Sequence, residues 1–241
     1  MIALILNSGM GSRMGDVSKL QPKCMTSLNN NETILGRQLR LIQRATIFNV
    51  VVTTGKFDVM IQEHCHTYAP ELEYVFVKNP IYDKTNYIYS IYLAQKYLHD
   101  DVLLMHGDMV FEDGIIQDMI QSNKSCMAVC KSQSLPQKDF KAVMHYSIDG
   151  QRTDNFIEQI GIDCFENAYA AQPLYYLKKK DWELWLNEII SFCERKQVNC
   201  YAENAFNRIS DKCLIYPYEI GRRVCGEIDT CEDLYVMRER I

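Results

Sequence analysis

The chain has 241 residues, 47% of them apolar, and a formal net charge of −5. That length and apolar content suffice for one domain with a sizeable core, and they exclude a disordered chain. The acidic balance excludes a protein that binds nucleic acid through a global basic field. No apolar run approaches the roughly 18 residues that a membrane-spanning helix needs, so we expect no membrane insertion.

Ten cysteines occur without a C-x-x-C pair. Residues 1–6 form a short apolar run without a basic segment before it, so we expect no secretory signal. The cysteines are then expected to be reduced, mostly buried thiols in a cytoplasmic protein. The tract His64-Cys65-His66 has metal-binding residue types, but adjacent side chains diverge in any regular element, so we expect no metal there.

Short apolar runs alternate with amphipathic stretches through the first half of the chain. The runs predict buried strands at residues 1–6, 49–54, 73–77 and 102–106. The stretches between them predict helices at residues 34–45, 57–66 and 87–98. Such alternation predicts a parallel sheet in an α/β layer.

The second half is less regular. A strand is expected at residues 126–131, and Asp149-Gly150 predicts a hairpin turn between strands at 141–147 and 156–160. One apolar face predicts a helix at 181–194, and a last strand is expected at 224–228. Thr230 then begins a final helix, with Asp233 at the third helical position as a variant of the capping box.

The strongest local signal is a glycine loop directly after the first strand, Leu6-Asn7-Ser8-Gly9-Met10-Gly11-Ser12-Arg13-Met14, with Pro22-Lys23 following. Backbone N–H groups of such a loop can point into one concavity that holds a polyphosphate. Arg13 and Lys23 would add fixed positive charge. The loop is not a P-loop, and it is a poor dinucleotide-binding fingerprint because position 14 is Met instead of Gly or Ala. An ordinary tight turn is the alternative.

Gly9-x-Gly11-x-Arg13-Met14 followed by Pro22-Lys23 resembles the signature loop of sugar-nucleotide pyrophosphorylases and related nucleotidyltransferases. That family usually has two alanines before the first glycine, where this chain has Asn7 and Ser8, a change that would alter contacts to the base or ribose. Asn79-Pro80 through Asn86 to Ala94 is similar to a stretch of bacterial choline-phosphate and 2-aminoethylphosphonate cytidylyltransferases. Glu227-Ile228-Asp229-Thr230 with Glu232-Asp233-Leu234 is similar to the family's C-terminal metal motif.

The resemblance covers nearly the whole chain and implies a fold. This fold is α/β, with a Rossmann-like mixed, mostly parallel sheet flanked by helices and a small β-rich acceptor-binding region. We expect a single domain over residues 1–241, with a nucleotide-binding half at 1–125 and an acceptor-binding half at 126–241 that carries the metal motif.

The resemblance also implies an activity. The chain would transfer CMP from CTP to a small phosphorylated or phosphonate acceptor, of the phosphocholine or 2-aminoethylphosphonate type, and release pyrophosphate. The motifs do not fix the acceptor, and the sequence leaves a homodimer open.

Two aspartates directly follow predicted strands. Asp108 comes after the strand at 102–106 and Asp229 after the strand at 224–228, and ligand crevices of open α/β sheets lie at the carboxyl ends of strands. By resemblance these two residues bind Mg²⁺, although each could instead be a turn or helix-cap aspartate. They are 121 residues apart (229 − 108), so only the fold could bring them together. Glu227 is a weaker candidate because strand alternation points it the same way as Asp229.

The resemblance assigns roles to the remaining residues. Lys23 would stabilise the α-phosphate in the transition state and Arg13 would hold the departing phosphates. A phosphate oxygen is already ionised at neutral pH, so no general base is needed. The expected nucleotide contacts are Leu6, Asn7, Ser8, Gly9, Met10, Gly11, Ser12, Arg13, Lys23, Thr54, Gly55, Asn86, Ser90 and Gly107. Candidate acceptor contacts are Glu227 and four tyrosines whose rings could attract a quaternary ammonium or simply pack, namely Tyr82, Tyr87, Tyr89 and Tyr169.

Three alternatives stay open. Arg222 and Arg223 would favour an anionic acceptor head if either faced the site, but they could equally be a solvated pair. The chain could also be a sugar-1-phosphate nucleotidyltransferase that uses UTP, GTP or dTTP, although it is short for that branch. A non-catalytic nucleotide-binding protein is disfavoured, because mere binding does not need Arg13, Lys23 and both aspartates together.

Overall fold

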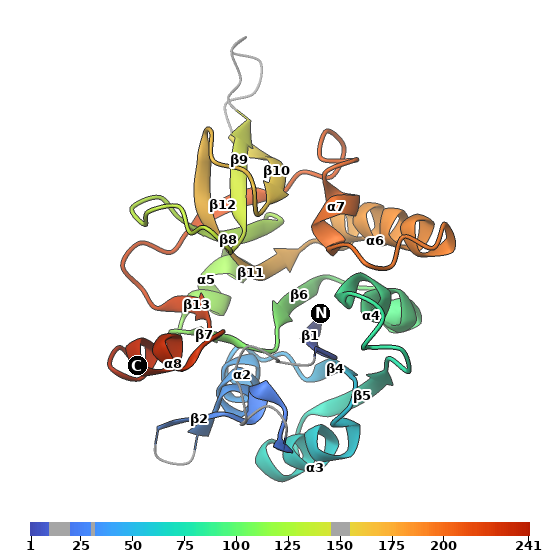
Figure 1. Cartoon of the computed structure of the whole chain (residues 1–241), viewed down its shortest axis with the longest axis vertical. Helices are drawn as coiled ribbons and strands as arrows, with labels where there is room; N and C mark the ends of the chain where they lie inside the picture. Colours follow the sequence, from blue (N-terminus) through green and yellow to red (C-terminus); the bar gives the residue numbers. More distant parts are fainter. Residues whose placement is uncertain (10–19, 30–31, 146–154) are drawn as a thin grey trace.

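The structure is a computed structural model, and it describes residues 1–9, 20–29, 32–145 and 155–241. A mixed sheet of nine strands forms the centre, with helices packed on both of its faces (Figure 1). Its main path runs β10-β9-β11-β6-β1-β4-β5, and β8 joins β11 to β12. The nine strands are β1 Ile2–Asn7, β4 Asn49–Thr54, β5 Glu73–Lys78, β6 Val102–His106, β8 Cys126–Cys130, β9 Lys141–His145, β10 Phe156–Gly161, β11 Ala168–Leu177 and β12 Tyr216–Glu219. The prediction of a mixed sheet flanked by helices is confirmed.

Strands β5, β4, β1 and β6 are parallel neighbours in that order. Their register aligns the end of β1 with the end of β6, because Leu6 lies opposite His106. The sequence places β4 and β6 at their observed bounds, since β4 is rich in β-branched residues, β6 is mostly apolar, and a glycine follows each of them. The loops that follow β1 and β6 therefore leave the sheet at the same edge.

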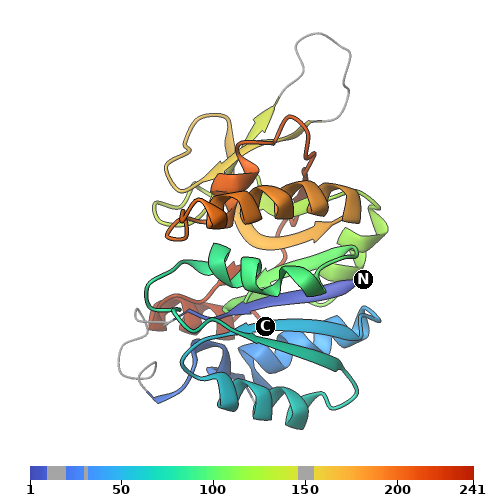
Figure 2. The same cartoon turned by 90° about the vertical axis from the view of Figure 1, so that its right-hand side faces the viewer.

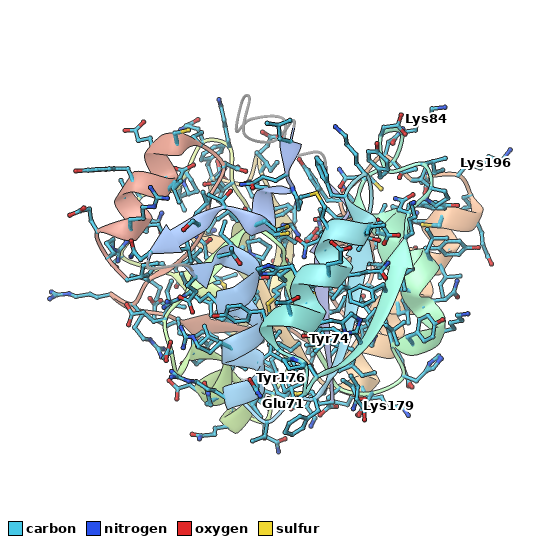
Figure 3. The ribbon with its side chains drawn as sticks, turned by 90° about the horizontal axis from the view of Figure 1, so that it is seen from below. Glu71, Tyr74, Lys84, Tyr176, Lys179 and Lys196 are labelled. Atoms are coloured by element: carbon cyan, nitrogen blue, oxygen red, sulfur yellow. The ribbon has the colours of Figure 1, made fainter. Side chains whose placement is uncertain are left out.

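Alternate residues of β1 enter two different cores, as strand geometry requires. Leu4 and Leu6 pack with the helices on one face, whereas Ala3 and Ile5 pack with those on the other. The first core includes residues of α4 (Tyr87–Ala94) and α6 (Lys179–Glu194), and the second includes residues of α2 (Ile34–Arg44), α3 (Asp58–Tyr68) and α5 (Ile115–Gln121). Figure 2 shows α4 and α6 side by side on the face turned to the viewer. In Figure 3, α6 runs along one edge from Lys179 at its start to Lys196 beyond its end.

The second half contains the main departure from the sequence-based expectations. The hairpin of β9 and β10 is confirmed as an antiparallel pair, although its expected turn at Asp149-Gly150 lies outside the described residues. Strand β11 was not expected, yet it pairs antiparallel with β6, β8 and β9. Its interior contains Pro173, which argues against a strand; here the proline coincides with a register shift, where strands tolerate it. Edge strand β12, also unexpected, contains Pro217.

The expected last strand is shorter than predicted and lies off the main sheet. β13 (Cys225–Glu227) pairs with β7 (Met109–Phe111) in a separate two-stranded sheet. Thr230 caps α8 (Cys231–Arg238), and the capping box with Asp233 is confirmed. The remaining short elements are η2 Lys23–Met25, β2 Ser27–Asn29, β3 Glu32–Thr33, η3 Gln95–Tyr97 and α7 Ala202–Phe206.

All ten cysteines are free thiols and six of them are buried, as expected. In the His64-Cys65-His66 tract, Cys65 enters the core, whereas His64 contacts the Thr33 hydroxyl. His66 lies against the Tyr74 and Phe76 rings, so the three side chains have different surroundings. No helix in the described part of the chain is long and apolar enough to span a bilayer.

Candidate active site

A cavity of about 510 Å³ opens where β1 and β6 end. Its lining comes from the start of the glycine loop, η2, the loop before α4, the turn after β6 and several segments of the second half. The described lining residues are Leu6, Asn7, Ser8, Gly9, Pro22, Lys23, Cys24, Tyr82, Asp83, Thr85, Asn86, Tyr87, His106, Gly107, Asp108, Lys138, Asp139, Phe140, Ile162, Tyr201, Glu227 and Asp229. The ends of parallel strands, where the sequence argument expected a ligand crevice, thus form part of its lining.

The charged floor of this cavity consists of Lys23, Asp108 and Asp229. The Lys23 ammonium donates to Asp108 Oδ2 at 2.6 Å and to Asp229 Oδ1 at 2.5 Å. The two aspartates are 121 residues apart in the sequence (229 − 108), and the fold brings both of them into contact with the Lys23 ammonium. Burial alone would raise the pKa of Asp108, but the Lys23 ammonium and His106 outweigh it and lower that pKa. Burial also opposes the charge on Lys23, yet the two carboxylates raise its pKa.

The turn that carries Asp108 is fixed by its backbone. Gly107 N donates to Leu6 O at 3.0 Å, and Ile228 N donates to Asp108 O at 3.0 Å. The second bond ties the segment just before Asp229 to Asp108. A Cβ on Gly107 would lie 1.7 Å from Asn7 Oδ1 and 2.9 Å from Leu6 O, so a larger residue would displace both the Asn7 side chain and the backbone at the end of β1.

Ser8, at a position where the family usually has an alanine, has a structural role in this chain. The Ser8 and Ser90 hydroxyls lie 2.7 Å apart, and Asn79 Nδ2 donates to Ser90 Oγ at 3.0 Å. All three side chains are buried. This network fastens the start of the glycine loop to α4, so Ser90 supports Ser8 from behind the cavity and does not line it.

His106 and Glu227 form a second charged pair in the cavity, and sequence reasoning missed His106. The distance from His106 Nδ1 to Glu227 Oε1 is 3.0 Å. Burial would lower the pKa of His106, but the contact with Glu227 outweighs burial, so the pKa of His106 is raised. The pKa of Glu227 is also raised, by burial and by the nearby Asp108 carboxylate. Among the described residues, His106, Asp108 and Glu227 offer ligand atoms within 4.8 Å of one another, so they could hold a metal ion.

Next to the charged floor, four rings of the cavity lining form an aromatic wall, made of Tyr87, His106, Phe140 and Tyr201. Successive ring centroids lie 5.8 Å (Tyr87–Tyr201), 5.1 Å (Tyr201–Phe140), 6.5 Å (Phe140–His106) and 4.7 Å (His106–Tyr87) apart, so each ring contacts two others of the set. Behind the wall, the buried Glu203 accepts hydrogen bonds from the Tyr87 and Tyr175 hydroxyls. The wall offers ring faces and edges to a small ligand, with a carboxylate behind one ring.

Several predicted residues lie outside this lining. Thr54 is buried and donates to Asp58, and Gly55 packs so closely that a Cβ would lie 2.6 Å from Ser8 O. Tyr89 stacks on Tyr92, and the Tyr169 ring lies under Lys131. Met10, Gly11, Ser12 and Arg13 belong to the segment that the structure does not describe.

Arg222 and Arg223 do not reach the cavity. Arg223 donates to Asp118 and to the Tyr218 hydroxyl, and Arg222 is exposed. The inference of an anionic acceptor head from these arginines therefore has no structural support. The loop residues Lys138, Asp139, Phe140, Ile162 and Tyr201, in contrast, line the cavity without belonging to any motif. Only His106 had a usable signal, because it ends a strand next to a predicted metal ligand.

Comparison with known proteins identifies the family. Over residues 3–190 the chain matches the family described as MobA-like NTP transferase domain. It is 27% identical to a CTP:phosphoglutamine cytidylyltransferase of Campylobacter jejuni, with all of both chains covered. It is 26% identical to a CMP-5'-(3-aminopropyl)phosphonate synthase of Streptomyces rubellomurinus over 73% of this chain and 28% of that protein. A choline-phosphate cytidylyltransferase of Haemophilus influenzae is 30% identical over 48% of this chain and 47% of that protein.

Solved structures show the same fold at low sequence identity. An inositol-1-phosphate CTP transferase from T. maritima superposes with a TM-score of 0.75 at 17% identity and covers 99% of this chain and 95% of its own. A CTP:phosphocholine cytidylyltransferase from Streptococcus pneumoniae superposes with a TM-score of 0.74 at 17% identity and covers 99% of this chain and 98% of its own. The family match spans the glycine loop, Lys23 and Asp108, and the chain accordingly belongs to the MobA-like NTP transferase family, which consists of nucleotidyltransferases.

Proposed function

We propose that this chain is a cytidylyltransferase that transfers CMP from CTP to a small phosphorylated or phosphonate acceptor and releases pyrophosphate. The observation that carries the proposal is the charged floor, in which Lys23 bridges Asp108 and Asp229 beside the start of the glycine loop. A nucleotide-binding protein without catalysis has no need for a buried cation held by two carboxylates at this place. The names of the three relatives support the choice of CTP.

We further propose that Asp108 and Asp229 hold Mg²⁺. Among the described lining residues, the cavity has five carboxylates and only two lysines, so a triphosphate would meet net negative charge without an added cation. Asp108 Oδ1 is buried and has no hydrogen-bond partner among the residues described, which leaves a hard oxygen donor unused. When bound, Mg²⁺ would supply positive charge to the phosphate oxygens.

The chain's own residues would act by positioning and by neutralising charge. An acceptor oxygen attacks the α-phosphorus of CTP, and the bond from that phosphorus to the pyrophosphate oxygen breaks. Lys23 would neutralise the α-phosphate as charge accumulates on it, and Arg13 would hold the departing pyrophosphate. Asn7, Ser8, Gly9 and Asn86 would contact the nucleotide; Asn86 is fixed as the N-cap of α4.

The aromatic wall is the proposed contact surface for the head group of the acceptor. Of the tyrosines predicted for this role, Tyr82 and Tyr87 line the cavity, and Tyr201 and Phe140 now join them. Tyr89 and Tyr169 are left out of the proposal because they lie elsewhere. Glu227 stays a candidate that could orient an amino group of the acceptor.

One assay tests the proposal. Pyrophosphate release should require CTP and Mg²⁺ together with one of four acceptors: phosphoglutamine, 3-aminopropylphosphonate, phosphocholine or 2-aminoethylphosphonate. CTP should also raise the melting temperature more than UTP, GTP or ATP at equal concentration, because a ligand stabilises the native state that binds it. Equal shifts with all four nucleotides would contradict the choice of CTP. Release with UTP, GTP or dTTP and a sugar 1-phosphate would replace the proposed function by the alternative branch.

A further inference from the structure

A buried glutamine outside the cavity holds the turn that carries Asp108. Gln38 belongs to α2, where it is 1% exposed and lies between the core residues Leu35 and Leu39. Its Nε2 donates to His106 O and to Met109 O, both at 2.9 Å. These two carbonyl groups directly flank Gly107-Asp108, so one side-chain amide spans the whole turn.

We propose that Gln38 is a positioning residue that fixes the Gly107-Asp108 turn and thereby the direction of the Asp108 carboxylate. The inference rests on the proposed function, in which Asp108 binds Mg²⁺. Gln38 does not line the cavity, and it would touch neither substrate nor reacting atoms. It acts through the backbone on both sides of Asp108.

The hydrogen bonds around the turn support this role. Gln38 holds the carbonyl groups on either side, Leu6 O accepts from Gly107 N, and Ile228 N donates to Asp108 O. Of these four hydrogen bonds, two are donated by the Gln38 side chain, and the other two join backbone groups. Without the two from Gln38, two carbonyl groups next to Asp108 would lose their donor, and the turn could tilt away from Asp229.

Packing alone does not account for an amide at this position. Gln38 Oε1 is buried and has no hydrogen-bond partner in the described part of the chain. An orphaned buried acceptor is unfavourable. A methionine would fill nearly the same volume without that acceptor, so what the amide adds is its pair of donated hydrogen bonds.

The test replaces Gln38 by Met, with Gln43→Met as the matched control on the same helix. The Gln43 amide points to Glu71 on the surface. The probe is Mn²⁺ alone, whose binding is followed by electron paramagnetic resonance, together with hydrogen exchange of the Gly107 and Ile228 amides. Gln38→Met should weaken Mn²⁺ binding about tenfold or more, as loss of groups that orient metal ligands typically does. Both amides should exchange faster, and Gln43→Met should change neither readout.

Steady-state kinetics adds a readout that a purely structural role would not produce. For Gln38→Met, kcat should fall about tenfold or more while KM for CTP changes less, because misplacing the carboxylate affects the transition state more than nucleotide binding. If Gln38→Met does not fold, Gln38→Asn keeps the amide but is too short to span both carbonyl groups. The same faster exchange and weaker Mn²⁺ binding are expected from it.

The outcomes separate this inference from the proposed function. Unchanged amide exchange in Gln38→Met would overturn the role of Gln38, even if the melting temperature fell. Faster exchange with wild-type Mn²⁺ affinity would also overturn it, provided that Asp108→Asn abolishes Mn²⁺ binding. If the wild-type protein and Asp108→Asn bound Mn²⁺ equally, the metal assignment would fail instead. Faster exchange in Gln38→Met would then still support Gln38 as the residue that fixes the turn.

Discussion

The charged floor and the aromatic wall of the cavity are built in different ways. Asp108 of the floor lies in a turn at a sheet edge, where backbone hydrogen bonds and the Gln38 amide fix it. The wall combines rings from four separate segments, which side-chain contacts align: the rings pack on one another, and Tyr87 and His106 also bond to Glu203 and Glu227. This difference fits the proposed division of roles, in which the floor binds the metal and the phosphates and the wall contacts the head group of the acceptor.

The largest effect should come from removing either carboxylate of the floor. Asp108→Asn and Asp229→Asn should each lower turnover at least about a thousandfold, because an amide is a poor Mg²⁺ ligand and no longer balances Lys23. Pyrophosphate release measures the loss, and circular dichroism checks the fold. Asp113→Asn, which changes an exposed carboxylate in the nearby loop, is the matched control and should keep its activity. Activity above a few per cent in either floor variant would remove that residue from the metal site.

Removing the cation of the floor should have the next largest effect. Lys23→Ala should lower kcat roughly a hundredfold, as loss of one preorganised electrostatic group typically does. Its KM for CTP should change less, because the interaction strengthens mainly in the transition state. Arg13→Ala should also raise KM, since the β- and γ-phosphates are charged before the reaction begins. A change in KM alone for Lys23→Ala would make the lysine a ground-state clamp.

The aromatic wall should respond differently from the floor. Tyr201→Ala should raise KM for the acceptor by about tenfold and leave KM for CTP nearly unchanged, since the variant removes a ring from the acceptor side only. Tyr89→Ala is the comparison, because Tyr89 stacks on Tyr92 away from the cavity. Initial rates at varied acceptor concentration distinguish the two. Equal effects of both variants on acceptor KM would mean that the wall does not select the acceptor.

The smallest effect should come from the cap of α8, next to the floor. Asp233 Oδ2 accepts hydrogen bonds from Asp229 N at 3.0 Å and Thr230 N at 2.7 Å, and Thr230 Oγ1 accepts one from Asp233 N. Thr230→Ala should therefore lower the free energy of unfolding by about 1 kcal/mol and turnover by less than tenfold. Urea unfolding measures the first change. Thr67→Ala, on the exposed surface of α3, should not lower stability, and a similar loss there would argue against a specific cap.

Sequence patterns predicted the floor better than the wall. All three floor residues, Lys23, Asp108 and Asp229, were predicted, because each follows a recognisable strand or loop signal, and the structure brings them together. Phe140 and Tyr201 were missed, since each lies in an irregular segment whose neighbours give no periodic signal. Strand β11 was missed for a related reason, because Pro173 contradicts the local pattern and only the bulge against β8 accommodates it.

The sequence by itself determined the alternation of buried strands and helices, the bounds of β4 and β6, the capping box of α8 and the residue types of the floor. These are local properties, set by hydrophobic periodicity and by hydrogen bonds between near neighbours in the chain. Only the tertiary structure decided that Lys23 lies between two aspartates, that Ser90 supports Ser8, that Gln38 spans the Asp108 turn and that four rings form one wall. Those contacts join residues tens to hundreds of positions apart, and they depend on the parallel pairing of β1 and β6, which places the segments that follow these two strands side by side.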